Sequence, residues 1–140
     1  MARGYEFRFR IDVYTPDTLP MARLAEYMAD VATLLGEKNS VHFVRLEPGS
    51  ATLVQRVDDP AIPKVRQRVI QVRSGEAPPE AMAAYRSVNR RLKQDNAVGE
   101  MTEETGAKII SFPGREQNEP ATFGAFNQPS ALDGAPRRNR

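Results

Sequence analysis

Arginine and lysine side chains offer the clearest chemistry in this sequence, because eight of them fall between positions 60 and 95 against three acidic residues. In the stretch 78–96, which we expect to be helical, Arg86, Arg90 and Lys93 are spaced i, i+4 and i+7 and therefore share one helix face. In the preceding helical stretch, 62–74, Arg66 and Arg73 are seven residues apart. Phosphate groups bind such a surface by releasing counterions, with an affinity that falls steeply as salt rises. The sequence therefore nominates five phosphate contacts: Arg66, Arg73, Arg86, Arg90 and Lys93.

Tyr85 and Asn89 lie near these cations in the sequence and would stack on bases or hydrogen bond to them. The same charges also fit a solvated helix face, because positions 96–120 carry five acidic and two basic residues and can fold back on the basic stretch. The signatures of the common nucleic-acid-binding folds are absent. Nucleic-acid binding is therefore the alternative hypothesis, and the solvated face is the simpler one.

Residues for catalysis or metal binding are few. His42 is the single histidine, and Asp12 would orient its ring if the two residues lay on neighbouring strands. Asp58 and Asp59 precede Pro60, where turn chemistry already explains them, so we assign them no metal. The chain has no cysteine, no glycine-rich phosphate loop and no nucleophile elbow. The sequence predicts no catalytic residue and no cofactor, and a small enzyme using His42 is the third hypothesis.

Length and composition are those of a mixed globular domain. The chain has 140 residues, of which 40% are hydrophobic, and a mean hydropathy of -0.54. This length suits one compact domain with a tail. No apolar run approaches the roughly 18 to 20 residues that span a bilayer, and the N-terminus lacks the apolar segment of a secretory signal. We therefore expect a cytoplasmic protein that does not bind membranes.

The first half of the chain has two strongly patterned segments. Apolar and charged residues alternate over positions 5–14, which predicts a half-buried strand. Apolar residues then recur at helical spacing over 24–35, between Pro20 and Gly36, which predicts a helix. Two β-rich runs follow at 41–47 and 51–57, and the short Pro-Gly-Ser connection between them predicts a hairpin.

The second half completes an α+β pattern. Helices are predicted after Pro63 and after Pro79, and a last short strand at 107–112. The order β-α-β-β-α-α-β predicts a small, mostly antiparallel sheet that helices cover on one face. We place this single domain at 1–114. Positions 115–140 form a polar tail or linker rich in Gly, Pro and Asn, whose large apolar residues are Phe123, Phe126 and Leu132.

A resemblance covers most of the chain. The run from Tyr5 to Phe112, followed by Ala-Thr-Phe-Gly-Ala-Phe-Asn-Gln-Pro-Ser-Ala-Leu-Asp-Gly, resembles the N-terminal part of longer uncharacterised bacterial proteins of unknown function. In those proteins the Phe-Gly-x-Phe segment leads into a second, β-rich domain. The shared residues include no catalytic motif, so the resemblance implies no activity. This chain departs from the pattern in its last residues, Ala-Pro-Arg-Arg-Asn-Arg, as a truncation or an altered terminus would.

A small fold without a catalytic constellation favours an interaction module that has no enzymatic activity. We expect it to self-associate or to bind another protein, with an exposed strand pairing across a two-fold axis. The strand at 5–14 and the short strand at 107–112 are the expected edges. Phe123 and Phe126 would dock on a neighbouring molecule.

Overall fold

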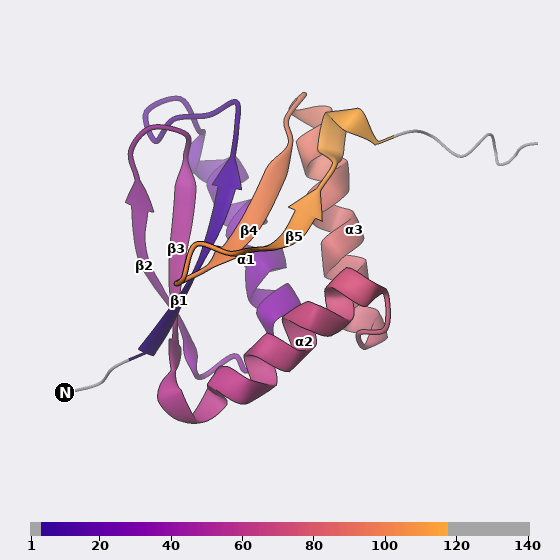
Figure 1. Cartoon of the computed structure of the whole chain (residues 1–140). Coiled ribbons are helices and arrows are strands. Elements are labelled where there is room, and N and C mark those ends of the chain that lie inside the picture. Colours follow the sequence, from indigo (N-terminus) through magenta and orange to yellow (C-terminus); the bar gives the residue numbers. More distant parts are fainter. Residues whose placement is uncertain (1–3, 118–140) are drawn as a thin grey trace, which may run out of the picture.

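The computed structural model describes residues 4–117 and shows a five-stranded antiparallel sheet with helices packed on one face (Figure 1). The chain runs β1 (Gly4–Ile11), α1 (Met21–Leu35), β2 (Val41–Glu47), β3 (Thr52–Asp58), α2 (Ile62–Ser74), α3 (Pro79–Gln94), β4 (Gly99–Glu103) and β5 (Lys108–Phe112). Two 3₁₀ turns, η1 (Asp59–Ala61) and η2 (Gly114–Glu116), precede α2 and follow β5. The predicted α+β class is confirmed.

Strand β1 lies in the middle of the sheet, whose order is β2-β3-β1-β4-β5. Its alternating sequence buries Phe7, Phe9 and Ile11 completely on the side of the helices. Phe9 lies opposite Leu53 of β3 and opposite Met101 of β4. The expectation that this strand is an edge is therefore wrong, because both of its backbone edges are paired.

The three helices bury their apolar faces against this sheet. Buried residues recur at helical spacing in α1 (Tyr27, Val31, Leu34, Leu35), α2 (Val65, Val69, Val72) and α3 (Ala81, Ala84, Val88, Leu92). Helices α1 and α3 lie side by side and antiparallel, because Arg23 near the start of α1 hydrogen bonds to Asp95 at the end of α3. Helix α2 crosses one end of this layer (Figure 1).

Strand β4 adds one strand to those that the sequence predicts. Its residues, Gly-Glu-Met-Thr-Glu, have little preference for strands. The glycine is explained by packing, since a Cβ at Gly99 would lie 3.0 Å from Phe9 Cε1 and 3.1 Å from Leu92 Cδ1. Strand β1 is shorter than predicted: it ends at Ile11, and Val13 is 44% exposed.

The face of the sheet away from the helices, which we call the open face, carries paired charges. Arg8 lies 2.9 Å from Glu6 and 3.5 Å from Glu47, and Arg45 lies 2.8 Å from Glu47. Val54 points to this face between Arg8 and Arg45, and yet it is completely buried. Long arginine side chains on both sides of a residue cover apolar surface with their aliphatic stems while their charged ends stay in water, which accounts for this burial.

Candidate functional site

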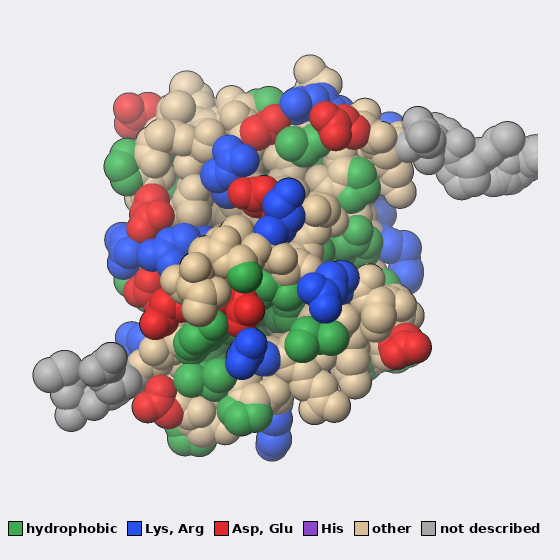
Figure 2. Space-filling view, viewed as in Figure 1, with side chains coloured by type: hydrophobic (Ala, Val, Ile, Leu, Met, Phe, Trp, Pro, Cys, Tyr) green, Lys and Arg blue, Asp and Glu red, His purple; other side chains and the backbone are tan. Residues whose placement is uncertain are grey.

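The outward side of α3 carries three of the nominated cations. Arg86, Arg90 and Lys93 are all exposed there, on the side opposite the buried Val88. Within residues 4–117, Arg86 and Arg90 have no ion-pair partner, whereas most other arginines do. Figure 2 shows Lys and Arg side chains along the margin of the molecule where α3 lies. Unneutralised guanidinium groups are the part of this surface that an anion would bind.

Arg73, in the last turn of α2, also has no acidic partner in the described part of the chain. It lines a groove of about 320 Å³ together with Tyr85 of α3 and with Lys108 and Ser111 of β5. The Tyr85 hydroxyl donates to the Ser111 carbonyl oxygen at 3.1 Å. This hydrogen bond joins α3 to β5 at the side of the groove, and it uses the hydroxyl proton of Tyr85 within the domain.

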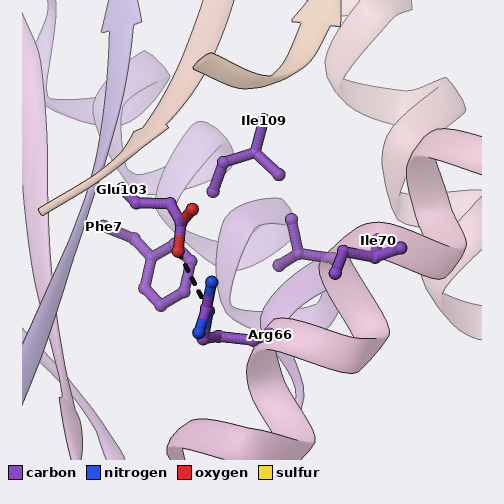
Figure 3. A pocket seen from close by; sticks show the side chains of 6 residues that line it. Phe7, Arg66, Ile70, Glu103 and Ile109 are labelled. Atoms are coloured by element: carbon purple, nitrogen blue, oxygen red, sulfur yellow. Dashed lines mark ion pairs between the residues drawn. The ribbon is translucent and has the colours of Figure 1, made fainter. Parts of the chain in front are cut away.

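Arg66, the fifth nominated cation, is part of an internal ion pair. Its guanidinium lies 3.0 Å from Glu103 and over the Tyr5 ring, 5.7 Å from the ring centre. The Tyr5 hydroxyl also donates to Glu103, at 3.0 Å. Figure 3 shows this pair beside a small cavity of about 20 Å³ that Phe7 and Ile70 help to line. At this point the acidic stretch does fold back on the basic one.

Two further arginines of the basic stretch connect helices. Arg68 donates to the carbonyl oxygens of Leu34 at 2.9 Å and Thr33 at 2.8 Å, at the C-terminal end of α1. Arg91 of α3 pairs with Asp30 of α1 at 2.9 Å. Arg66, Arg68 and Arg91 of the basic stretch thus hold the fold together, whereas Arg73, Arg86 and Arg90 have no acidic partner among residues 4–117.

A cluster around Asp95 also joins α1 to α3. Arg23 donates to both carboxylate oxygens of Asp95 at 3.0 Å, and the Tyr27 hydroxyl donates at 2.7 Å. Burial alone would raise the pKa of Asp95, but the hydrogen bonds and charge of Arg23 and the Tyr27 hydroxyl hold it below its ordinary value. Burial and the neighbouring Asp95 raise the pKa of Tyr27. These partners satisfy the cluster internally, so a structural role explains it.

Asn89 and Tyr85 differ in what they can contact. Asn89 is 4% exposed and accepts the backbone N–H of Gly114 at 3.2 Å, so it joins α3 to η2 and does not reach a ligand. The expectation that it contacts nucleic acid is wrong for this reason. Tyr85 is half-buried, with its ring centre 5.1 Å from that of Phe112.

His42 and Asp12 do not meet, because β3 separates β2 from β1. His42 Nε2 lies 3.1 Å from Asp58 Oδ2, and this hydrogen bond is the largest cause of a pKa of Asp58 below its ordinary value. Asp12 accepts the N–H of Val98 at 2.9 Å and pairs with Arg115 at 2.8 Å. The structure therefore contradicts a catalytic pair of these two residues. Residues 4–117 contain no group of three His, Asp or Glu side chains that could hold a metal ion.

The outer strand β2 is a surface that sequence analysis missed. It pairs with β3 on one side, and Phe43 and Val44 are 49% and 37% exposed. Phe43 lies opposite Gln55 and Arg45 lies opposite Val54, so Val44 is an extra residue in a β-bulge. The sequence contains a signal of this bulge, because the apolar residues that face the helices, Val41 and Phe43, occupy odd positions and the next one, Leu46, occupies an even position.

A shallow hollow of about 590 Å³ lies over the outward side of α2 and is lined by Ile62, Pro63, Arg66 and Ile70. Ile70 is 46% exposed, so a large apolar side chain is half-exposed on this helix as well. Phe123 and Phe126, which we expect to dock on a neighbour, lie outside the described residues.

Comparison with protein-family models, with curated proteins and with solved structures gives no match. None of the helices in residues 4–117 is both long and apolar enough to cross a bilayer. The candidate surfaces are therefore the β2 edge, the outward side of α3 and the groove beside β5, each defined by its own geometry.

Proposed function

We propose that this domain is an interaction module without catalytic activity that assembles with a second copy of itself through an edge of its sheet. The observation that carries the proposal is the pair of half-exposed apolar residues, Phe43 and Val44, on the uncovered edge strand β2. An edge strand presents unpaired backbone donors and acceptors, which pair most readily with another strand. The expected cytoplasmic location is compatible with such assembly.

The two edges of the sheet differ in how well they are protected. Strand β5 has five residues and begins with the exposed Lys108. Ile109 is an extra residue between the pairings of this strand with Met101 and Thr102 of β4, and the Ser111 carbonyl oxygen accepts the Tyr85 hydroxyl. Short length and an edge lysine block edge pairing, and β2, although it also contains a bulge, has neither of these two features. Strand β2 has seven residues and exposes Phe43, so we propose β2 as the self-associating edge instead of the strands at 5–14 and 107–112 that the sequence suggests.

Analytical ultracentrifugation of the whole chain from about 1 µM to 1 mM tests the proposal, because this range covers binding free energies of about -8 to -4 kcal/mol. We expect the weight-average mass to rise from monomer to dimer. Phe43→Lys should weaken the association at least about tenfold, since it places a charge on the apolar edge. Ile70→Lys is the matched control, because Ile70 is 46% exposed on α2, far from this edge in the fold. A monomer at every concentration contradicts the proposal.

A second candidate function is binding of nucleic acid through the outward side of α3. It is favoured by one observation, the absence of an acidic partner for Arg86 and Arg90 in residues 4–117. Two phosphate contacts contribute about 1.8 to the slope of log affinity against log salt. Arg73 is positioned to extend the same basic surface toward β5.

Fluorescence anisotropy with short single- and double-stranded DNA and RNA, at about 50 and 200 mM salt, tests this candidate. The variant Arg86→Glu with Arg90→Glu should weaken binding of all sequences and flatten the salt dependence. Lys38→Glu with Lys64→Glu removes the same net charge from exposed positions on other elements and is the control. Equal loss in both double variants, or no binding by the native chain, excludes a site on α3.

A further inference from the structure

The bulge in β2 changes which residues of this strand share a face. Before the bulge, Val41 and Phe43 lie on the helix side and His42 on the open face; after it, Leu46 lies on the helix side and Arg45 on the open face. In an antiparallel pair of identical strands, opposed residues must share a face of the continuous sheet. For the whole strand to pair, a residue before the bulge must therefore oppose a residue after it.

Two registers satisfy this condition, 41–46 against 46–41 and 42–47 against 47–42; the first opposes His42 to Arg45, so the second, which opposes His42 to Glu47, is the complementary one. It places position 42 opposite position 47 of the second copy, position 43 opposite 46, and position 44 opposite 45, with the two-fold axis between 44 and 45. Every residue from His42 to Glu47 is then opposed by another residue of the same segment. The pairing is isologous, as a two-fold interface requires.

The backbone of β2 is oriented for this same register. Asp58 N–H donates to the Ser40 carbonyl oxygen at 2.9 Å, so the backbone groups of residue 40 face β3. Alternation then turns the N–H and C=O of Phe43 away from β3. On β3 the same alternation points the backbone N–H and C=O groups of residues 52 and 54 toward β2. The backbone groups of their partners, Glu47 and Arg45, therefore point toward β3, and those of Leu46 point away from it. Phe43 and Leu46 of the second copy would thus exchange two hydrogen bonds, and the two-fold axis makes four.

The opposed side chains are complementary as well. His42 would lie opposite Glu47 of the second copy on the open face, and Phe43 opposite Leu46 on the helix side. Arg45 would lie opposite Val44, which is uncharged. A regular strand without Val44 that kept the pairs 42 with 47 and 43 with 46 would put the two copies of Arg45 directly opposite each other. Like charges in directly opposed positions are destabilising.

On these grounds we infer that the partner of the β2 edge is a second copy of this chain, paired antiparallel in the register 42–47 against 47–42. The two five-stranded sheets then join into one sheet of ten strands. The inference rests on the proposed function and adds the interface and its register. The bulge, which on most edges prevents pairing, here selects the second copy.

Disulfide trapping tests the register, and the native chain is suited to it because it contains no cysteine. Residues 42 and 47 would form a non-hydrogen-bonded pair with Cα atoms about 4.5 Å apart, which is within the range that a disulfide bridges. We therefore expect a mixture of whole-chain His42→Cys and Glu47→Cys to form a covalent dimer under mild oxidation. Each variant alone, and His42→Cys mixed with Arg45→Cys, should form much less of it.

Deletion of Val44 provides an independent test that needs no cysteine. It should weaken self-association at least about tenfold in ultracentrifugation, because it brings the two Arg45 side chains into opposition. Circular dichroism of each variant checks that the monomer fold is retained, and Ala substitution of Val44, which keeps the bulge, is the folding-matched control.

The outcomes separate the two proposals. If the native chain dimerises but the 42–47 mixture does not crosslink selectively, the register is wrong and self-association stands. If the deletion leaves association unchanged, the role of the bulge is wrong. If the native chain stays monomeric, both the register and the proposed function are overturned.

Discussion

Single polar side chains, placed in or near the core, connect elements that are distant in the sequence. Asp95 accepts hydrogen bonds from Arg23 and Tyr27 of α1, and Arg68 donates hydrogen bonds to the last carbonyl groups of the same helix. Asn89 holds η2 against α3. Each such group has its partners inside the domain, and hydrogen bonds to charged groups contribute about 1.5–3 kcal/mol. Substitutions at these positions therefore affect stability more than binding.

Asp95→Asn should lower the free energy of unfolding by about 2 kcal/mol at neutral pH, because the Arg23 guanidinium loses its charged acceptor in a partly buried site. Urea unfolding measures the change. Asp17→Asn is the control, since Asp17 is exposed and in a turn. A loss equal to that of the control contradicts the structural role of the cluster.

Arg68→Ala should cost about 1.5 kcal/mol, because the carbonyl groups of Thr33 and Leu34 at the end of α1 lose a charged donor. Lys64→Ala, one turn earlier on the exposed side of α2, should change the unfolding free energy by less than about 0.5 kcal/mol. Thermal unfolding of the two variants side by side distinguishes a cap from a general effect of charge.

At the level of elements, η2 is locked to α3 through Gly114. This residue has a φ of 49°, and a Cβ on it would clash with the Ala97 carbonyl oxygen. Gly114→Ala should therefore destabilise the domain by about 2–3 kcal/mol in urea unfolding. Gly49→Ala also has a positive φ, of 80°, but open space around its Cβ, and should cost about 1 kcal/mol. If both variants lost the same free energy of unfolding, the positive φ alone would explain the loss, and the predicted clash at Gly114 would be contradicted.

The elements with a strong period were predictable from sequence. Alternation gave β1, helical spacing gave α1 and α3, and the shared face of Arg86, Arg90 and Lys93 followed from i, i+4 and i+7. Strand β4 was missed because its pairing with β1 comes from packing around Gly99, not from local preference. The Arg66–Glu103 ion pair could not be predicted, since it depends on where β4 lies.

On the scale of the whole domain, five carboxylates within residues 4–117 have pKa values below their ordinary range: Asp12, Glu26, Glu47, Asp58 and Asp95. The unfolded chain therefore binds more protons than the folded chain at acidic pH. Stability should be fully present above the ordinary carboxyl pKa of about 4 and be lost as pH falls through the lower folded values. Urea midpoints at about pH 7, 5, 4 and 3 test this, and a midpoint independent of pH contradicts it.

The central place of β1 also decides the order in which the domain can fold. The strand made first pairs with β3 as soon as the hairpin is made, but its other edge waits for β4, more than 85 residues later. A nascent chain lacking β4 therefore exposes the backbone of β1 beside the completed half of the sheet. Such late, long-range pairing slows folding and leaves an unpaired edge on the intermediate. During synthesis, the strand that is best protected in the finished domain is the one most open to misassociation.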